Sequence, residues 1–597
     1  MRFVAIQNWL FFNKTKSAYY LPILVLLCTN SLLLWQGLYG PLIFDDLPNL
    51  SHLLGETVDY HSSIFENQAG PFGRIVTMAT FAMNHWFSGS MVSFELKISN
   101  LFIHLINGIL LYYFLFELLK IKLPVGRVSV LVPIVTALWM FNPVNSETVL
   151  YTIQRATLLS TLFMLGACIV YLNIRKYHKE IKFSVLLKIT LTSFLWALAM
   201  LSKENAVVLP CIILCIEFCF FNNLKKNQIN SKAFSFFLVT FAIPISLCTL
   251  FLIYDLGFLD YANRGYSIEE RVFTQPVVLL TYLKDMLFPF AFDIGIYRDD
   301  FPVQTTFWNV TTVGSFLSIA IALTIALLNL KNEQIKYLSF GVLVYFCGHL
   351  LESTIFPLEF FFWHRNYFPS IGVFLFIVLA LDALVLNIFM RKSLIIFSFL
   401  YCFLFAQQSH LQAKIWSSYE SILISAYEKH PESLRVNLEL VGELVKQGYL
   451  QKSLELNTAI INAKPKEALP AKLQRLYIYC ELANEFPTEN YDLFRGELNI
   501  SRPLLVSSAL RNFLHSYKFR ECKFIKLRLV IDLFISWIDT QLISDSQTAE
   551  SLWNIDYYMI EMLFLIGEDE EAYTRLNEHI ARGNTKAAYF VEYILNK

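Results

Sequence analysis

Residues 19–50, YYLPILVLLCTNSLLLWQGLYGPLIFDDLPNL, join a long apolar run to two adjacent aspartates. A helix needs roughly 20 apolar residues to cross a hydrocarbon core about 30 Å thick, and residues 19–39 supply such a run. Asp45 and Asp46 therefore follow directly on an expected membrane helix. They form either a polar cap on that helix or part of a functional site.

The composition of the chain is that of a polytopic membrane protein. Of its 597 residues, 56% are hydrophobic and 16% are charged, which is too apolar for a soluble protein of this length. Its formal net charge is zero, so the charge balance offers no basis for binding nucleic acid. The expected fold class is all-α, with about eleven membrane helices. The expected spans are 19–39, 96–118, 128–141, 148–174, 185–201, 204–222, 234–255, 309–330, 338–352, 367–389 and 393–409.

Basic residues between the spans predict the orientation, because short cytoplasmic loops are rich in Lys and Arg. The basic clusters are Lys14/Lys16, Lys120/Lys122/Arg127, Arg175/Lys176/Lys179/Lys182, Lys225/Lys226/Lys232, Lys331/Lys336 and Arg391/Lys392. Placing all of them in the cytoplasm predicts a cytoplasmic N-terminus and an exported C-terminus. This orientation requires that the apolar stretch 277–292 does not cross, and we expect an amphipathic or re-entrant segment there.

The same orientation places four polar stretches of the membrane domain, residues 1–413, on the extracytoplasmic side. These stretches are 41–94, 142–147, 256–308 and 352–368, with the short segment 202–205 beside them. The first and third are loops of roughly fifty residues, and loops of that length in a compact protein are usually functional. The polar motifs are therefore expected to gather on one side of the membrane.

Residues 414–597 are charged and helix-periodic, which predicts a second, helical domain outside the membrane. The segment 434–465 fits a tetratricopeptide (TPR) unit, although the Trp and Tyr positions of that motif are absent. The fit rests on Leu440, Leu444, Gly448, Ser453 and Pro465. We expect a small stack of antiparallel helices, in which Cys480 and Cys522 pair if the compartment is oxidising.

The aspartate pair is the first candidate for chemistry, because it has no basic neighbour in the sequence. An adjacent negative charge and partial desolvation would raise the pKa of one carboxyl toward that of a general base. Asp46 is slightly favoured over Asp45, because it lies farther from the helix end. The alternative is that both residues only cap the helix and solvate the interface.

Two further polar motifs suit an anionic ligand. Glu147 and Arg155 are eight residues apart, which places them on about one face of a continuous helix. An intramembrane arginine suggests a phosphate or carboxylate partner, and a structural ion pair is the alternative. In residues 352–372, Arg365 offers a planar fork to a phosphate and His364 a switchable donor. Lys203 is a further candidate for the phosphate, and the supporting candidates are Glu147, Glu204, Glu352, Arg271, Asp299 and Asp300.

Several catalytic signatures are absent from the sequence. It contains no glycine-rich phosphate loop, HExxH motif, CxxC pair or GxSxG motif. Cys211, Cys215 and Cys219 repeat every four residues, but no further Cys or His completes a metal site with them. No metal site is assigned. A divalent ion is kept as a candidate cofactor, although no carboxylate spacing selects one.

Five segments of the chain carry a family resemblance. They are NPVNSETVLYTIQR, LSKENAVVLP, RVFTQP, IYRDDFP and HRNYFPSIG, and they accompany the Asp-Asp pair of the first outer loop. Together they resemble bacterial relatives of the transmembrane and tetratricopeptide repeat-containing proteins. That family belongs, with the protein O-mannosyltransferases, to the C-type glycosyltransferase (GT-C) superfamily. Many relatives have His at the position of Asn142, so no role is transferred there.

The resemblance implies a glycosyltransferase of the bacterial inner membrane, acting at the periplasmic face on a polyprenyl-phosphate-linked or diphosphate-linked sugar. It implies that Asp45 or Asp46 is the catalytic base, and that the acceptor is an exported protein held by the repeats. The expected phosphate-binding residues are Arg155, Arg365, His364 and Lys203. The alternatives are a surface polysaccharide or lipid as acceptor or, outside this class, a transporter, a flippase or a scaffold.

Overall fold

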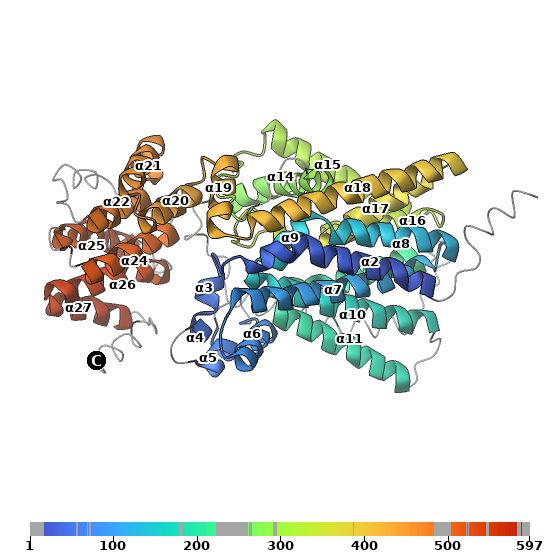
Figure 1. Cartoon of the computed structure of the whole chain (residues 1–597), viewed down its shortest axis with the longest axis horizontal. Helices are drawn as coiled ribbons and strands as arrows, with labels where there is room; N and C mark the ends of the chain where they lie inside the picture. The colour runs from blue at the N-terminus through green and yellow to red at the C-terminus, as the bar shows by residue number, and fades with distance from the viewer. Residues whose placement is uncertain are drawn as a thin grey trace, which may run out of the picture.

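The computed structural model describes most of the chain, and the regular structure of the described part is helical, with no strand. The described residues are 17–54, 58–67, 70, 73–177, 183–221, 241, 261, 266–289, 295–385, 387–482, 503–520, 522, 525–544, 549–581 and 587. Figure 1 shows a bundle of long helices and a second group of helices at one end of it. The predicted all-α fold class is confirmed.

Long apolar helices form the bundle. In the described part of the chain, seven helices are long and apolar enough to cross a membrane, or eight if one bent pair counts as a span. The bundle helices are α2 (Ser17–Leu34), α7 (Ser93–Leu119), α8 (Val125–Met140), α9 (Pro143–Leu150), α10 (Arg155–Tyr177), α11 (Phe183–Ser202), α12 (Leu209–Ile216), α14 (Ile268–Leu287), α15 (Val310–Asn329), α16 (Lys336–Gly348), α17 (Pro369–Ala383) and α18 (Ile388–Ile415).

The predicted count of eleven spans is not reached by these helices. Two expected spans, 338–352 and 367–389, correspond to the shorter apolar helices α16 and α17. A third, 234–255, lies outside the described residues except for Phe241. The described helices therefore support a polytopic membrane protein with seven or eight candidate spans.

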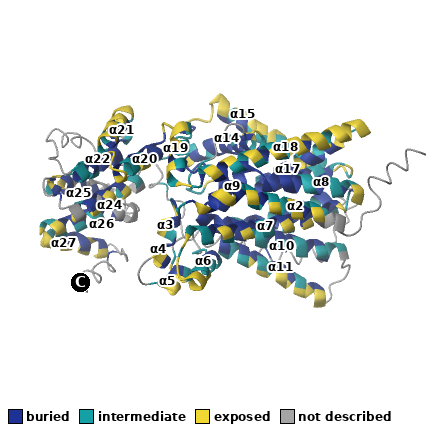
Figure 2. Ribbon diagram, in the orientation of Figure 1, coloured by how far each residue is buried: buried dark blue, intermediate teal, exposed yellow. Residues whose placement is uncertain are grey.

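The outer surface of the bundle is apolar. Figure 2 shows exposed residues along α18 and α15, and Ile321, Ile396 and Phe399 are among them. An apolar surface of this extent is unusual for a protein surrounded by water. It suits contact with lipid.

The chain between α8 and α10 departs from the predicted continuous helix. α9 is bent by 56° relative to α8, and Tyr151 then takes an extended conformation with ψ 107° before α10 begins. Glu147 and Arg155 thus lie on different helices, and the prediction that they share one helix face is wrong. The turn is compatible with burial because Asp46 accepts a hydrogen bond from the backbone that follows it.

α14 covers much of the segment that was expected not to cross the membrane. It begins at a capping box formed by Ser267 and Glu270, a feature typical of a helix start. It is not among the candidate spans of the described chain. Arg271 and Gln275 are buried on it together with apolar residues such as Val278 and Met286, so α14 packs a mixed polar and apolar face against the protein.

Asn142 has a structural part in joining α9 to α14. Its side-chain oxygen caps α9 by accepting from Val144 N at 2.9 Å, and its amide donates to the Met286 carbonyl at 3.1 Å. An amide supplies both a donor and an acceptor in this position. This accounts for Asn142 without any role in a reaction.

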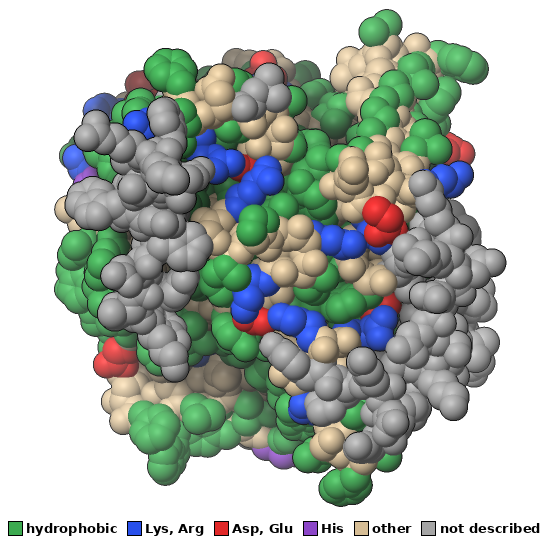
Figure 3. Space-filling view, turned by 90° about the vertical axis from the view of Figure 1, so that its right-hand side faces the viewer, with side chains coloured by type: hydrophobic (Ala, Val, Ile, Leu, Met, Phe, Trp, Pro, Cys, Tyr) green, Lys and Arg blue, Asp and Glu red, His purple; other side chains and the backbone are tan. Residues whose placement is uncertain are grey.

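Basic side chains gather at the end of the bundle opposite the second group of helices, as Figure 3 shows. Loops far apart in sequence meet there. Lys122 Nζ lies 3.4 Å from Glu333, and Lys176 Nζ lies 2.5 Å from Glu117. The two basic clusters that contain Lys122 and Lys176 were expected in one compartment, and these contacts agree with a shared end of the bundle.

The tail, residues 419–581, is a stack of helices. Its helices are α19 (Tyr419–Lys429), α20 (Leu434–Lys446), α21 (Leu450–Ala463), α22 (Leu469–Leu482), α24 (Pro503–Arg520), α25 (Leu527–Ser544), α26 (Ala549–Ile566) and α27 (Asp569–Ala581). α20 and α21 pack together, and Gly448 joins them with a φ of +80° that favours glycine. Val441 and Val445 are buried on α20, whereas Leu440 and Leu444 are half-buried. The tail is helical as predicted.

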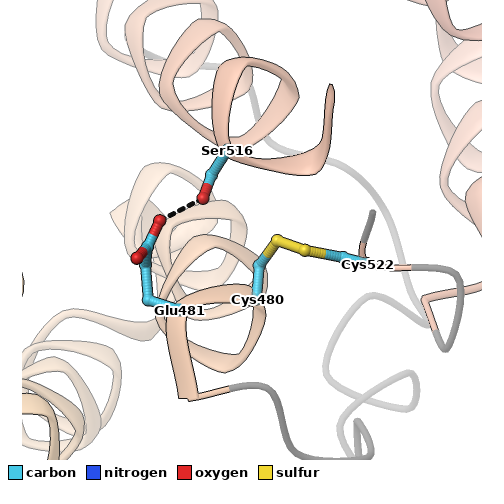
Figure 4. Close-up of a disulfide and its surroundings, with 4 residues drawn as sticks. All are labelled: Cys480, Glu481, Ser516 and Cys522. Atoms are coloured by element: carbon cyan, nitrogen blue, oxygen red, sulfur yellow. Dashed lines mark hydrogen bonds between the residues drawn. A yellow bond between two sulfur atoms is a disulfide. The ribbon is translucent and has the colours of Figure 1, made fainter. Parts of the chain in front are cut away.

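A disulfide links two helices of the tail (Figure 4). Cys480 of α22 and Cys522, just after α24, are bonded with their Cα atoms 5.5 Å apart. Beside them, Ser516 of α24 donates a hydrogen bond to Glu481 of α22. The pairing, which the sequence analysis made conditional on an oxidising compartment, is therefore compatible with the fold.

Candidate active site at the tail end of the bundle

The aspartate pair lies at the end of the bundle that faces the tail. Asp45 precedes the short helix α3 (Asp46–Asn49), which Figure 1 places at this end. The preceding loop is anchored at Gly40, where a Cβ atom would lie 1.8 Å from the Trp416 carbonyl oxygen at the end of α18. Glycine is required for so close an approach.

Phe44 holds an unusual backbone conformation next to the pair. Its φ is +54°, a left-handed value that is an outlier for a bulky residue. Such conformations cost on the order of 1–3 kcal/mol and cluster at functional sites. The Phe44 ring lies 6.2 Å from the Tyr297 ring and 5.4 Å from the Arg435 guanidinium. These contacts fix the backbone from which Asp45 projects.

Asp46 is fully buried, and its carboxylate accepts hydrogen bonds from two backbone N–H groups. Its Oδ2 accepts from Ile43 N at 3.0 Å, and its Oδ1 accepts from Ile153 N at 2.7 Å. Burial raises the pKa of Asp46, while these two amides and the charge of Lys97 oppose the rise. Asp46 thus stabilises the turn at the start of α10 and its own loop, and both its oxygens are occupied.

Asp45 has an exposed side chain but is crowded by protein. Its backbone N–H donates to the Tyr151 hydroxyl at 3.1 Å. Desolvation raises the pKa of Asp45, and Tyr151, Arg435 and Arg74 oppose that rise. An accessible carboxylate with a raised pKa suits a general base. The geometry therefore favours Asp45 over Asp46, which reverses the slight preference drawn from sequence alone.

Arg74, whose charge acts on Asp45 and on Glu352, connects Asp45 to two ion pairs. Arg74 donates to Glu204 from Nη2 at 2.7 Å and from Nε at 3.2 Å, and Lys203 Nζ lies 3.1 Å from Glu352 Oε1. Arg74 also has a left-handed φ of +47° and acts electrostatically on Asp45. The predicted residues Lys203, Glu204 and Glu352 thus come together with Asp45 through Arg74.

The segment that precedes α17 adds a second arginine. Arg365 is buried, and its Nη1 donates to the carbonyls of Glu359 at 2.7 Å and Phe360 at 3.2 Å. Within the described residues, its Nε and Nη2 make no hydrogen bond. The carboxylate of Glu359 accepts from Arg435 Nη2 at 2.7 Å. Arg365 therefore retains donors that could meet an anionic group.

Glu147 and His364 form a buried pair close to these cations. Glu147 Oε1 lies 3.7 Å from His364 Nδ1, and neither oxygen of Glu147 nor Nδ1 of His364 has a hydrogen-bond partner in the described chain. Burial and the charges of Lys203 and Arg365 lower the pKa of His364 well below its usual value. Unpaired buried polar groups are costly, so this pair is suited to a polar ligand.

Arg155 is engaged by protein on every side. Its Nε donates to Asn100 Oδ1 at 2.8 Å, its Nη1 to Asn84 Oδ1 at 2.6 Å and its Nη2 to the Leu96 carbonyl at 2.9 Å. The guanidinium also lies 3.9 Å from the centre of the Phe81 ring. This arrangement joins three helices and favours a structural role for Arg155, although the partners are neutral groups and not the acidic residue of the expected ion pair.

Arg271, Asp299 and Asp300 also serve the framework. Arg271 donates to three backbone carbonyls within residues 352–358. Asp299 accepts from the first turn of α20, and Asp300 Oδ2 lies 2.8 Å from His430 Nδ1. The structure thus uses Arg271 to shape the loop before α17 and the two aspartates to hold the tail.

Three members of this charged cluster were not predicted: Arg74, Tyr151 and Arg435. Arg74 carried a usable signal, because it is the only Lys or Arg in residues 41–94. Tyr151 stands in an apolar run, and Arg435 follows Asp45 by almost the whole membrane domain. Nothing in the local sequence of Tyr151 or Arg435 indicates the contact.

The described residues contain no group of three or more His, Cys, Asp or Glu arranged to hold a metal ion. The carboxylates of Glu204, Glu352 and Glu359 each contact a cationic side chain instead. These residues do not fit a divalent ion, and the chemistry below uses none.

Comparison of the chain with known protein families, curated proteins and solved structures gives no match. The function is therefore inferred from the site itself and from the sequence motifs.

Proposed function

We propose that the protein is a membrane glycosyltransferase that moves a sugar or glycan from a polyprenyl-phosphate-linked donor to a hydroxyl of an exported protein. The observation that supports it is the setting of Asp45, an accessible carboxylate near Arg74 and Arg435. Arg74 also acts on His364, as do Lys203 and Arg365, so these cations belong to one cluster. Glycosyl transfer from a lipid phosphate needs a base for the acceptor and cations for the leaving group. The cluster offers both within one end of the bundle.

The proposed reaction is a single displacement. The acceptor oxygen forms a bond to the anomeric carbon while the bond from that carbon to the phosphate oxygen breaks. Asp45 takes the hydroxyl proton, and the lipid phosphate leaves with the bonding electron pair. One displacement inverts the anomeric carbon.

The cations contribute by stabilising the charge that grows on the departing phosphate, and electrostatic stabilisation of this kind is often what accelerates such reactions most. Arg365 has guanidinium nitrogens to which no described residue is hydrogen-bonded, whereas Arg74 and Lys203 are already paired with carboxylates. Arg365 is therefore the principal phosphate ligand in this proposal. Glu147 and His364, whose carboxylate oxygens and Nδ1 have no hydrogen-bond partner in the described chain, would contact sugar hydroxyls or the phosphate.

The orientation we propose has the basic end in the cytoplasm and the tail in the periplasm of a bacterial inner membrane. The basic end agrees with the rule that cytoplasmic loops are positive. The disulfide of the tail agrees with an oxidising compartment. An exported acceptor would then meet the tail and the charged cluster on the same side, where TPR-like helices would bind it.

The test is transfer of labelled sugar by purified protein, with polyprenyl-phosphate sugars as donors and exported proteins of the same cell as acceptors. We expect Asp45→Asn to lower the rate by about 10²–10⁴-fold, the usual contribution of a general base. Asp59→Asn is the matched control, since Asp59 lies in the same outer region and caps α5 (Tyr60–Phe65), a role that Asn fills equally well.

Two results would count against the proposal. Absence of transfer by the wild-type protein from each donor, with the donor left intact, would remove the glycosyltransferase assignment. A wild-type rate for Asp45→Asn would remove Asp45 as the base while leaving the reaction class standing.

A further inference from the structure

The tail reaches the aspartate pair through the first turn of α20. Asp299 accepts from Ser433 Oγ and, at 3.3 Å, from Arg435 N. Ser433 is also the N-cap of α20. This double use fixes the start of the helix against the loop that precedes α15. Because the Arg435 N–H is part of this contact, the position of the Arg435 backbone is fixed as well.

The side chain of Arg435 ends between two elements of the membrane domain. Its Nη2 donates to Glu359 Oε1 at 2.7 Å, and its guanidinium lies 5.4 Å from the Phe44 ring. Only 17% of the side chain is exposed, so these contacts are largely sheltered from solvent. A guanidinium in such a place both stacks on an aromatic face and holds a carboxylate.

Phe44 is the residue through which this contact affects Asp45. Its φ of +54° is unfavourable for a side chain of its size, so surrounding contacts must hold it. Those contacts include the Tyr297 ring, the Arg435 guanidinium and the hydrophobic core. Loss of Arg435 would remove one of these contacts and leave the peptide that precedes Asp45 held by Tyr151 and by the packing of Phe44 alone.

We propose that Arg435 is a positioning residue for Asp45, so that the catalytic site is complete only when the tail is docked. This inference rests on the proposed function, in which Asp45 is the base. Arg435 contacts neither donor nor acceptor in this proposal. It acts by holding Phe44 and Glu359 and by placing a positive charge near the carboxyl.

Several charged groups face Asp45, and each affects its protonation in a known direction. They are Asp46 beside it, Tyr151 before η2 (Thr152–Gln154), Arg74 at the start of α6 (Ile75–Ser88), Glu359 before α17, and Arg435 of α20. Arg435 and Arg74 lower the pKa of Asp45, and Glu359 raises it. Removing Arg435 withdraws a cation and leaves Glu359 without its partner in this pair. Both changes raise the pKa of Asp45.

The experiment compares pH profiles of kcat/KM for transfer by wild-type protein, Arg435→Gln and Arg435→Lys. A carboxylate base works when deprotonated, so the acid limb of the profile follows its pKa. We expect Arg435→Gln to move the acid limb to higher pH, and Arg435→Lys to keep it near wild type with a smaller loss of rate. Lys452→Gln, which removes an exposed charge from α21, is the matched control and should change neither.

A second pair of variants separates positioning from folding. Glu359→Gln keeps Arg435 and should move the acid limb to lower pH, because it removes a negative charge near Asp45. The double variant Glu359→Gln with Arg435→Gln should return the limb toward wild type. A uniform loss of rate in Arg435→Gln at every pH, with an unmoved limb, would overturn the inference and reduce Arg435 to a structural contact.

The failure of this inference is distinct from failure of the proposed function. If Asp45→Asn abolishes transfer while the limb of Arg435→Gln stays in place, the glycosyltransferase proposal stands and the positioning role is wrong. If Asp45→Asn transfers at the wild-type rate, Asp45 is not the base, and the positioning role falls with it.

Discussion

Asp45 and Asp46 are neighbours in sequence with different surroundings. Asp46 is enclosed and holds the N–H groups of Ile43 and Ile153, whereas Asp45 is exposed beside Arg74 and Arg435. A carboxylate that already accepts two backbone hydrogen bonds is poorly placed to take a proton from a substrate. The pair therefore divides into a structural residue and a candidate base.

Asp46→Asn should destabilise the protein rather than act on the chemical step alone. One amide NH₂ group would face a backbone N–H, leaving a buried donor unsatisfied, which costs about 1–3 kcal/mol. We expect a lower thermal midpoint for Asp46→Asn in detergent, with Asp45→Asn close to wild type. The reverse order of the two midpoints would contradict the division of roles.

His364 should make stability depend on pH. Its pKa is well below the usual value because of burial and the neighbouring cations, so the folded protein keeps it neutral. The unfolded chain binds a proton on it below a pH of about 6.5. Stability then falls as pH decreases from that value, by at most about 1.4 kcal/mol per pH unit.

The measurement is the thermal midpoint of wild type and His364→Gln at a pH of about 7.5 and about 5. His364→Gln lacks the titrating group, so its midpoint should drop less on acidification than that of the wild type. An equal drop in both proteins would show that His364 is already protonated in the folded state.

At the scale of elements, Arg155 joins α6, α7 and α10. It donates to Asn84 of α6, to Leu96 and Asn100 of α7, and stacks on Phe81. Lysine cannot reproduce a planar fork of donors, so Arg155→Lys leaves several acceptors unpaired. We expect a loss of unfolding free energy on the order of 3 kcal/mol.

The control for Arg155→Lys is Arg391→Lys, the same change at an exposed position of α18. It should leave the thermal midpoint unchanged. If Arg155→Lys instead kept the wild-type midpoint and lost only its affinity for the lipid-linked donor, Arg155 would be a phosphate ligand, as the sequence first indicated.

The elements show why sequence reasoning succeeded in part. Apolar length located most bundle helices, and basic loops identified segments that meet at one end, since both signals are local. The turn at Tyr151 was missed because the run around it is uniformly apolar, and its compensation comes from Asp46, distant in the chain. Arg435 was missed because the residues that it contacts, Phe44 and Glu359, are also distant in the chain. Lys203, Glu204, Glu352, His364 and Arg365 could be chosen as candidates from sequence because each is a charged or polar residue in an apolar setting.

At the level of the whole molecule, the two ends of the bundle differ: one carries basic loops and the other the candidate active site. Basic side chains gather at the end away from the tail, while the short helix α3, which follows Asp45, lies at the end that faces the tail. Asp299 and Asp300 hold the tail against the loop before α15, and Arg435 of the tail reaches the cluster at Glu359. The side of the membrane on which the tail lies is therefore the side on which the proposed reaction occurs.

The disulfide of the tail offers a measure of that side. A cytoplasmic tail would meet reducing conditions and keep Cys480 and Cys522 as thiols, whereas a periplasmic one would bond them. We expect both cysteines to resist alkylation in intact cells until a reductant is added. Cys28→Ser, which removes an exposed thiol outside the tail, should leave this protection unchanged.

Removing the disulfide should also weaken the tail itself. The bond closes a loop with a sequence separation of 42 residues, for which chain-entropy arguments give roughly 4 kcal/mol of stabilisation. Cys480→Ser with Cys522→Ser should therefore make the tail more sensitive to limited proteolysis and leave the bundle intact.

Because docking of the tail supplies Arg435 to Phe44 and Glu359, we also expect the double variant to lose transfer activity under conditions that unfold the tail. Free thiols in untreated cells would instead place the tail, and the charged cluster with it, in the cytoplasm.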